Sequence, residues 1–197
     1  SFATYTPNTD FNGSDSFTFS VSDGEYSASA SVDVNITPVN DAPVLALVSD
    51  VSFDEDGSGS ASLSGSDVDG DQLTFSITDG TDILASLDSS DISFNAPLNF
   101  NGSESFTVSV TDGEYTDSQI ITVTVNAVND APTADAATGV TAEDQSVVIS
   151  LSGSDIDGDN LIFSLGDNAT SGSVSIDGSL ATYTPNTDFN GSDSFTF

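Results

Sequence analysis

Residues 10–19 read DFNGSDSFTF, and this decapeptide decides the fold because it returns twice. It recurs as NFNGSESFTV at residues 99–108 and unchanged at residues 188–197, a spacing of 89 residues each time. In each copy an Asn-Gly turn signal precedes an alternation of apolar residues with Ser or Thr, the pattern of a β-strand with one buried face. The chain is therefore a tandem array of β-rich repeats.

Other landmarks support the same repeat and place its boundaries. NDAP at residues 40–43 returns at residues 129–132, and GSDVDGD at residues 65–71 returns as GSDIDGD one residue early, at residues 153–159. A repeat of this length is close to that of an immunoglobulin-like sandwich. If each copy ends just after its Ala-Pro, the chain divides into the C-terminal part of a repeat at 1–44 (copy A), a complete repeat at 45–133 (copy B) and a truncated repeat at 134–197 (copy C).

The charge balance restricts the partners that the chain could bind. It carries 32 Asp and Glu, no Lys, Arg or His, and a formal net charge of -32. Nucleic acids and anionic membrane surfaces are bound through clustered Lys and Arg, so we expect neither as a partner. Hard cations would instead stabilise the compact state, which repulsion among like charges destabilises. There is no Cys and no apolar run long enough to span a membrane, so we expect no disulfides and no membrane insertion.

Alternating apolar residues indicate a folded chain, although low hydrophobicity with high net charge is typical of disorder. Asp-Gly, Asn-Gly and Ser-Gly turn signals separate the alternating segments, and no helical period is sustained. The predicted fold class is all-β, with about seven short strands per repeat in an antiparallel sandwich and the Phe side chains in its core. The expected inward faces are Leu73/Phe75/Ile77, Leu161/Phe163/Leu165, Phe106/Val108/Val110, Ile121/Val123/Val125 and Ala28/Ala30/Val32/Val34/Ile36.

Three acidic motifs recur at turn positions, and together they indicate calcium. They are the Asp-x-Asp-Gly-Asp turn, the Asn-Asp at the end of each copy, and the Asp/Asn-Phe-Asn-Gly loop with its following acid. Calcium takes carboxylate, Asn and carbonyl oxygens, which closely spaced Asp and Asn in turns provide, whereas soft-metal sites need Cys or His. The alternative interpretation, acidic decoration for solubility, explains scattered Asp but not an Asn-Asp at the same boundary twice. An EF-hand is excluded, because the position that requires a bidentate Glu is Thr78 in one copy and Gly166 in the other.

The chain resembles the cadherin-like, VCBS-type tandem repeats of large bacterial RTX-type surface adhesins, and more distantly animal cadherins, over nearly its whole length. The residues that carry the resemblance are VNDAP at the junction, the Glu-Asp pairs at 55–56 and 143–144, SDxDGDxLxFS, and YTPNxDFNGSDSFTFSVSDGE. It implies tandem immunoglobulin/cadherin-like antiparallel β-sandwiches with calcium ions bound between successive repeats.

Carried over position by position, the resemblance implies two sets of calcium ligands. Asp10 precedes Phe17 by seven residues, as the family pattern requires, and Asp112 matches the single Asp that closes the site. The junction has Ala where animal cadherins have a second Asn, and the loop has Asn where they have Glu, so we expect about one or two ions per junction. The first set is Asp10, Asn12, Asn40, Asp41, Asp67, Asp69 and Asp112, and the second is Glu55, Asn99, Asn101, Asn129, Asp130, Asp155 and Asp157.

The resemblance also implies a function, a calcium-rigidified extender of a bacterial cell-surface adhesin that acts in cell adhesion and biofilm formation. We expect an extracellular place at the bacterial surface, with calcium ions and neighbouring repeats of the same chain as partners. The alternative is a carbohydrate-binding or homophilic adhesive module of a secreted protein, whose partner would be a polysaccharide or another cell-surface protein. We expect no enzyme, because glycoside hydrolysis needs one shaped carboxylate pair and these acids repeat at turns in every copy.

Overall fold

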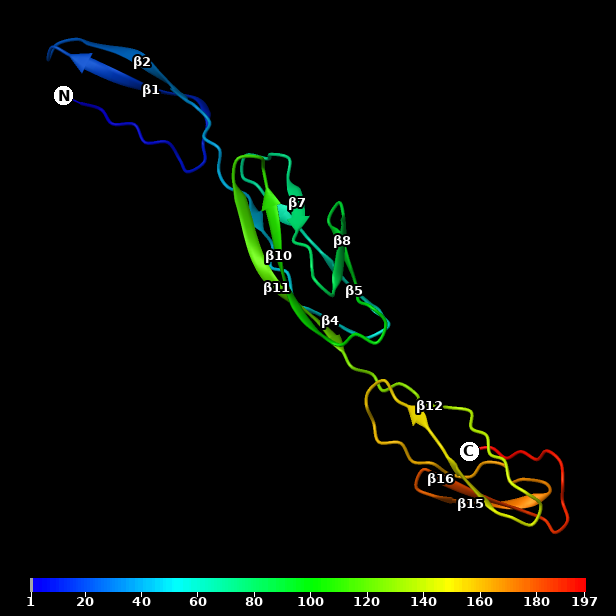
Figure 1. Ribbon diagram of the computed structural model, residues 1–197. Helices are drawn as coiled ribbons and strands as arrows, with labels where there is room; N and C mark the ends of the chain where they lie inside the picture. The colour runs from blue at the N-terminus through cyan, green and yellow to red at the C-terminus, as the bar shows by residue number, and fades with distance from the viewer. Residues whose placement is uncertain (1) are drawn as a thin grey trace. The chain divides into compact units, whose positions relative to one another are not determined.

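The computed structural model describes residues 2–197, which form two compact units (Figure 1). Unit 1 extends to Ala127, and unit 2 is Val128–Phe197. The expected all-β class is confirmed, since the regular elements of residues 2–197 are strands. Among the same residues no helix could span a membrane. Unit 1 holds copy A together with most of copy B, so the division into three copies remains a prediction.

Copy B forms the sandwich of unit 1. A four-stranded sheet in the order β4-β11-β10-β7 packs on a three-stranded sheet in the order β5-β9-β8, and β3 and β6 form a short ladder beside them. The two main sheets together hold the seven strands expected. The strands are β3 (Val44–Leu45), β4 (Val51–Asp54), β5 (Ser58–Ser62), β6 (Gly65–Ser66), β7 (Thr74–Ile77), β8 (Leu84–Asp88), β9 (Asp91–Asn95), β10 (Gly102–Thr111) and β11 (Thr116–Asn126).

One pair of strands departs from the antiparallel pattern. β4 pairs with β11 in parallel, from Val51 opposite Val123 to Asp54 opposite Asn126. The departure arises because a hydrogen-bonded turn after Asp54 sends the chain from the edge of one sheet into β5 of the other. β4 is left beside the last strand of the repeat, and the two run in the same direction.

The core of copy B contains the predicted inward faces of three strands. Phe106, Val108 and Val110 of β10 are fully buried, and the three apolar residues of β11 that are predicted to face inward are at most 2% exposed. The ring of Phe106 meets Phe94 of the opposite sheet edge to face, with centroids 5.3 Å apart. The face of β7 is partly buried against this cluster. The prediction that Phe side chains are core is therefore confirmed for copy B.

Copy A forms a two-stranded hairpin from β1 (Gly13–Ser22) and β2 (Ser27–Ile36). Its ladder runs from Gly13 opposite Ile36 to Ser22 opposite Ser27. No second sheet covers this hairpin among the described residues of copy A, so its apolar face is largely open to solvent. The prediction that Phe is core is wrong here, since Phe2, Phe11 and Phe19 are exposed.

Unit 2 has two smaller sheets, with strand orders β12-β14 and β13-β16-β15. The segment Leu161/Phe163/Leu165 keeps the predicted alternation of burial but forms no strand, which corrects that expectation. In copy B the equivalent strand β7 pairs with Val108–Thr111 of β10, and this segment has no such strand partner among the described residues of unit 2. The strands are β12 (Thr133–Ala134), β13 (Val147–Ser150), β14 (Gly153–Ser154), β15 (Gly172–Asp177) and β16 (Leu180–Pro185).

Candidate metal site

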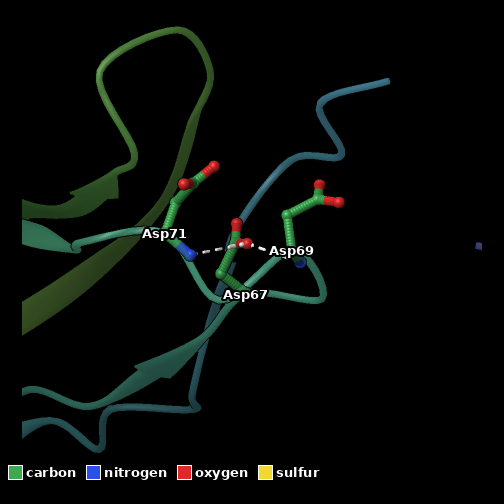
Figure 2. A group of neighbouring side chains, drawn as sticks. All are labelled: Asp67, Asp69 and Asp71. Carbon is green, nitrogen blue, oxygen red and sulfur yellow. Dashed lines mark hydrogen bonds between the residues drawn. The ribbon is translucent and has the colours of Figure 1, made fainter. Parts of the chain in front are cut away.

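The Asp-x-Asp-Gly-Asp turn directly after β6 folds around the side chain of Asp67. Asp67 Oδ1 accepts hydrogen bonds from the backbone N–H groups of Asp69 at 2.8 Å, Gly70 at 3.0 Å and Asp71 at 3.3 Å. Gly70 has a φ of 81°, a conformation that glycine adopts without strain. Figure 2 shows Asp67 between Asp69 and Asp71. The local sequence therefore builds a tight turn with acids at alternate positions.

This turn gathers three carboxylates without any cation from the protein. One oxygen from each of Asp67, Asp69 and Asp71 lies within 4.8 Å of the others. Asp67 Oδ2 is shielded from solvent and has no hydrogen-bond partner. A buried acceptor of this kind is destabilising unless something binds it, and the sequence contains no Lys, Arg or His. The donor set is all oxygen, which suits a hard cation such as calcium.

The segment before β3 is tied to the acid turn and to a hairpin. The Asp41 N–H donates to Asp69 Oδ2 at 2.8 Å, and Asn40 Nδ2 donates to Asp112 Oδ2 at 2.9 Å. Asp112 stands at the β10–β11 turn, where its Oδ1 also accepts the N–H groups of Glu114 and Tyr115. The N–H of Tyr115 first, and then those of Glu114 and Asn40, hold the pKa of Asp112 below its ordinary value. Asp112 is therefore ionised, and both of its oxygens have partners.

The Asp10 loop lies at the same place within unit 1. Asp10, Asn12, Asp41 and Asp69 are among the residues that line an open hollow of about 270 Å³. Burial first, and then repulsion from Asp10, Asp69 and Asp67, raises the pKa of Asp41 above its ordinary value. Three other carboxylates thus act on Asp41 at this position. A divalent cation would remove that repulsion.

Two acids that contact predicted ligands or cluster with them are absent from the predicted ligand sets. Asp71 belongs to the cluster of three carboxylates, and its signal was the recurrence of Asp-x-Asp-Gly-Asp with Asp159 at the same place. Asp56 accepts a hydrogen bond from the backbone of Asn99 at 2.9 Å. Nothing local in the sequence joins Asp56 to a loop so much later in the chain.

The second predicted set is divided between the two units, and each part is described by itself. In unit 1, Glu55 is 6% exposed, and its N–H donates to Asn126 O. Asn99 and Asn101 lie in the loop before β10, exposed or half-buried. Whether these side chains bind calcium stays a prediction.

Unit 2 repeats the acid turn and its tie to the preceding segment. Asp155 Oδ1 accepts the N–H groups of Asp157 at 3.0 Å and Asp159 at 3.1 Å, and the Asp130 N–H donates to Asp157 Oδ2 at 2.7 Å. Asn129 differs from its counterpart Asn40, because its side chain donates to the carbonyl of Asp130.

The acid that follows each Asn-Gly loop has a structural role. The carboxylate of Glu104 accepts the N–H groups of Thr81, Asp82 and Ile83, and that of Asp193 accepts those of Thr170 and Ser171. Burial opposes the ionisation of Asp193, but these and further hydrogen bonds outweigh it and lower its pKa to about 2. Burial likewise opposes the ionisation of Glu104, and its amide partners outweigh it and lower its pKa. Glu104 thus anchors a distant loop to the start of β10, and Asp193 anchors the equivalent loop of unit 2 to a segment that forms no strand.

Two family profiles match the chain. That of the bacterial Ig domain matches residues 40–124 and 129–197, and that of a cadherin-like domain matches residues 1–37. Domains of these families are typical of extracellular or surface proteins and are typically structural or adhesive modules without enzymatic activity. Cadherin-like domains typically bind calcium.

Solved structures of tandem domains are similar to the chain at low identity. The human protocadherin-24 EC1-2 structure is 17% identical, with a TM-score of 0.44, over 76% of this chain and 79% of that one. The titin domains Z1Z2, solved in complex with telethonin, are 10% identical, with a TM-score of 0.35, over 77% and 84%. Domains 1–6 of the surface layer protein SbsC are 15% identical, with a TM-score of 0.31, over 94% and 34%. No curated protein matches the chain.

The family matches cover the acid turns and the hairpins that the repeat defines. The bacterial Ig profile begins at Asn40 and includes the turn at residues 67–71 and its counterpart at residues 155–159. The cadherin-like profile includes the Asp10 loop and the β1–β2 hairpin. The chain belongs to the bacterial Ig domain family, and its first segment is cadherin-like.

Proposed function

We propose that this chain is a calcium-binding segment of a bacterial cell-surface adhesin, in which calcium stiffens the repeats so that they act as an extender. The observation that carries the proposal is the convergence of the Asp67, Asp69 and Asp71 carboxylates around a buried Asp67 oxygen without a partner, in a chain without basic residues. The adhesin-type character of bacterial Ig and cadherin-like repeats supports it. The role in cell adhesion and biofilm formation is part of the proposal.

The ligands of the ion would come from the acid turn, the Asp10 loop and the segment before β3. Asp67 Oδ2 and the free oxygen of Asp69 would supply carboxylate ligands. Asp10, Asn12 and Asp41 line the adjoining hollow and would complete an all-oxygen set. Asn40 and Asp112 would hold the segment before β3 in place through their hydrogen bond.

Stiffening would follow from how the ion changes the electrostatics. Without a cation, the carboxylates of Asp10, Asp41 and Asp69 repel one another and favour separation of the elements that carry them. With calcium bound, the same groups become ligands of one ion, and their separation breaks coordination bonds. Bound calcium would therefore hold together, within unit 1, the elements that repel one another in its absence.

The proposal extends to the second set of predicted ligands. In unit 2, Asn129, Asp130, Asp155 and Asp157 repeat the arrangement of an acid turn with a tied preceding segment. Glu55, Asn99 and Asn101 are the corresponding candidates at the end of unit 1. We propose that both groups take calcium through side-chain oxygens, and each can be tested by its own substitutions.

Calcium titration of the full chain tests the proposal. The chain is stripped with chelator, titrated by calorimetry, and compared with D67N/D69N and with the control D33N/D88N, which removes two exposed acids outside the predicted sets. We expect the first variant to lose at least one binding event, and the control to bind as the wild type does. Calcium at 100 times its dissociation constant should stabilise the folded state by about 2.7 kcal/mol.

The extender role needs a separate measurement of shape. Small-angle scattering with calcium and with chelator should show a longer particle when calcium is bound. Calcium uptake with an unchanged maximum dimension would remove the extender role and leave a calcium-binding domain. An absence of uptake at millimolar calcium would remove both.

One observation favours the alternative function, a carbohydrate-binding or homophilic adhesive module. Tyr26 and Tyr115 stand at the ends of the two long hairpins and are 71% and 44% exposed. Exposed aromatic rings at a hairpin end offer a surface for stacking on a sugar. A glycan array with the wild-type chain and with Y26S/Y115S separates the two functions. Saturable binding that the variant loses would establish the binder.

A further inference from the structure

The second acid of each Glu-Asp pair has a use that the proposed function leaves open. Asp56 and Asp144 occupy the third position of tight turns, closed by hydrogen bonds from Gly57 N–H to Asp54 O at 3.1 Å and from Gln145 N–H to Ala142 O at 3.2 Å. Their φ angles are 62° and 60°, in the left-handed region. Asp is one of the few side chains that tolerate this conformation.

A second left-handed turn faces each of these acids. Asn99 has a φ of 55° in a turn closed from Phe100 N–H to Pro97 O, and Asp188 has a φ of 59° in a turn closed from Phe189 N–H to Asn186 O. The N–H of the third residue is not used within such a turn. It is therefore free to donate to a group outside the turn.

The two turns are joined by the same hydrogen bond in both units. The Asn99 N–H donates to Asp56 Oδ1 at 2.9 Å, and the Asp188 N–H donates to Asp144 Oδ1 at 3.0 Å. The residues that it joins are 43 apart in one unit and 44 apart in the other. A charged acceptor makes this a strong hydrogen bond. Its recurrence in two separately folded units indicates a built feature of the repeat.

We propose that Asp56 and Asp144 are positioning residues, and we call the hydrogen bond that each accepts the clasp. In unit 1 the clasp holds the loop that carries the predicted calcium ligands Asn99 and Asn101, and in unit 2 it holds the equivalent loop, which contains Asp188. The inference rests on the proposed function, because it assigns these acids to the placement of ligands. The two acids of the Glu-Asp pair then have different roles. Glu55 is buried beside the end of β11 as a candidate ligand, and the exposed Asp56 fixes the loop.

The clasp determines where the loop lies rather than its internal shape. The equivalent loop of copy A has the same turn, with Phe11 N–H donating to Asn8 O and Asp10 at a φ of 61°, although no carboxylate among the described residues accepts the Asp10 N–H. The turn therefore forms from its own sequence. What Asp56 adds is a fixed distance between this loop and the turn after β4, which preorganises the ligands.

Three variants of the full chain test the clasp. D56G removes the carboxylate but keeps a residue at ease with a positive φ, D56N keeps an oxygen acceptor without the charge, and D88A removes one exposed acid at the β8–β9 turn as a control. Amide exchange of Asn99, followed by NMR in chelator, reports the hydrogen bond directly. Calcium affinity, measured by calorimetry, reports the placement of the ligands.

We expect the Asn99 amide to exchange roughly tenfold faster or more in D56G than in the wild type, D88A and D56N. We expect calcium affinity to fall roughly 10- to 100-fold in D56G, as it does when partners that orient metal ligands are removed, with D56N closer to wild type. D144G should have the same effect on the Asp188 amide.

Two results would overturn the inference. Unchanged exchange of Asn99 in D56G would show that the hydrogen bond does not hold the loop. Equal loss of calcium affinity in D56N and D56G, with the Asn99 amide still protected in D56N, would make Asp56 a ligand instead of a positioning residue. If the wild-type chain itself takes up no calcium, the proposed function and the ligand-positioning role fail together, and the exchange data still decide whether the clasp holds the loop.

Discussion

The two long hairpins of unit 1 have a similar first strand and turn but different surroundings. β1–β2 and β10–β11 share the Asn-Gly start, the Asp-Gly-Glu-Tyr turn and the same antiparallel register around it. In β10 the apolar residues Phe106, Val108 and Val110 are fully buried, whereas Phe19 and Val21, at equivalent positions of β1, are 49% and 62% exposed. The hairpin is thus a local structure, and its burial depends on the second sheet that only copy B supplies.

The largest expected difference between the hairpins is in their aromatic core positions. F106A should destabilise unit 1 by about 3–5 kcal/mol, because it removes a buried ring packed on Phe94. F17A should cost only about 1 kcal/mol, since Phe17 is partly exposed and stacks on Tyr5. Urea unfolding followed by NMR resonances of β10 and β1 measures both. Equal costs would show that β1–β2 is buried against something in solution.

The anchoring acids should differ in the same direction. E104A leaves the N–H groups of Thr81, Asp82 and Ile83 without their acceptor and should cost about 2–3 kcal/mol. D15A removes a hydrogen bond from the Tyr5 hydroxyl at an exposed position and should change stability far less. Thermal unfolding in saturating calcium compares the variants. E104Q, which keeps one oxygen acceptor, should lie between wild type and E104A.

Low pH should remove the stabilising contribution of Asp193, the acid at the equivalent position of unit 2. Its pKa is about 2 in the folded chain, against an ordinary value of 3.8, so the folded state favours the carboxylate. Its stabilising contribution is therefore complete above pH 3.8 and is lost as the pH falls toward 2. Unfolding of unit 2 between pH 5 and pH 2 measures this loss, and D193N should reduce the pH dependence. A pH dependence unchanged in D193N would contradict the assignment.

The acid of the hairpin turn should matter for calcium in only one hairpin. Asp23 and Asp112 both accept two N–H groups of their own turn, but only Asp112 also accepts Asn40 among the contacts of residues 2–197. We expect D112A to weaken calcium binding about tenfold or more and D23A to leave it unchanged. Calorimetry on the two variants provides the measurement. Equal losses would show that the turn acids act through net charge alone.

The smallest expected difference between the hairpins is at their turn glycines, where both should respond alike. Gly24 and Gly113 have φ angles of 98° and 103°, and a Cβ at either would meet no atom within 4 Å. Alanine should therefore cost about 1 kcal/mol at each through backbone strain alone. Amide exchange in the two ladders checks that the costs are equal. A clear difference between the two costs would mean that the burial of the hairpin, and not its turn conformation, determines the effect of alanine.

The repeat and its turn chemistry could be predicted from the sequence because both are local. Period-two alternation fixes which face of β10 and β11 is apolar, and the predicted faces are the buried ones. The acid turn at residues 67–71 could be identified for the same reason, since its hydrogen bonds join residues at most four apart. Asp71 was left out of the ligand sets because a motif does not show which of its oxygens converge.

Contacts across the repeat could not be predicted in this way. The parallel pairing of β4 with β11, the clasp from Asp56 to Asn99 and the anchor from Glu104 to residues 81–83 each join segments that are distant in the chain. Such partners are chosen when two sheets pack, because packing brings their edges and loops to one place. A carboxylate in the sequence does not show whether its partner is an amide, a hydroxyl group or an ion.

The sequence by itself determined the repeat, the all-β class, the apolar faces and the turns that gather Asp and Asn, since each follows from residues a few positions apart. Only the tertiary structure decided which of those faces is buried and which acids are anchors, clasps or candidate ligands. The physical reason is that every acid carries the same charge, and its role depends on its surroundings. Amide donors bind both oxygens of Glu104, whereas in Asp67 they bind only one and leave the other among neighbouring carboxylates.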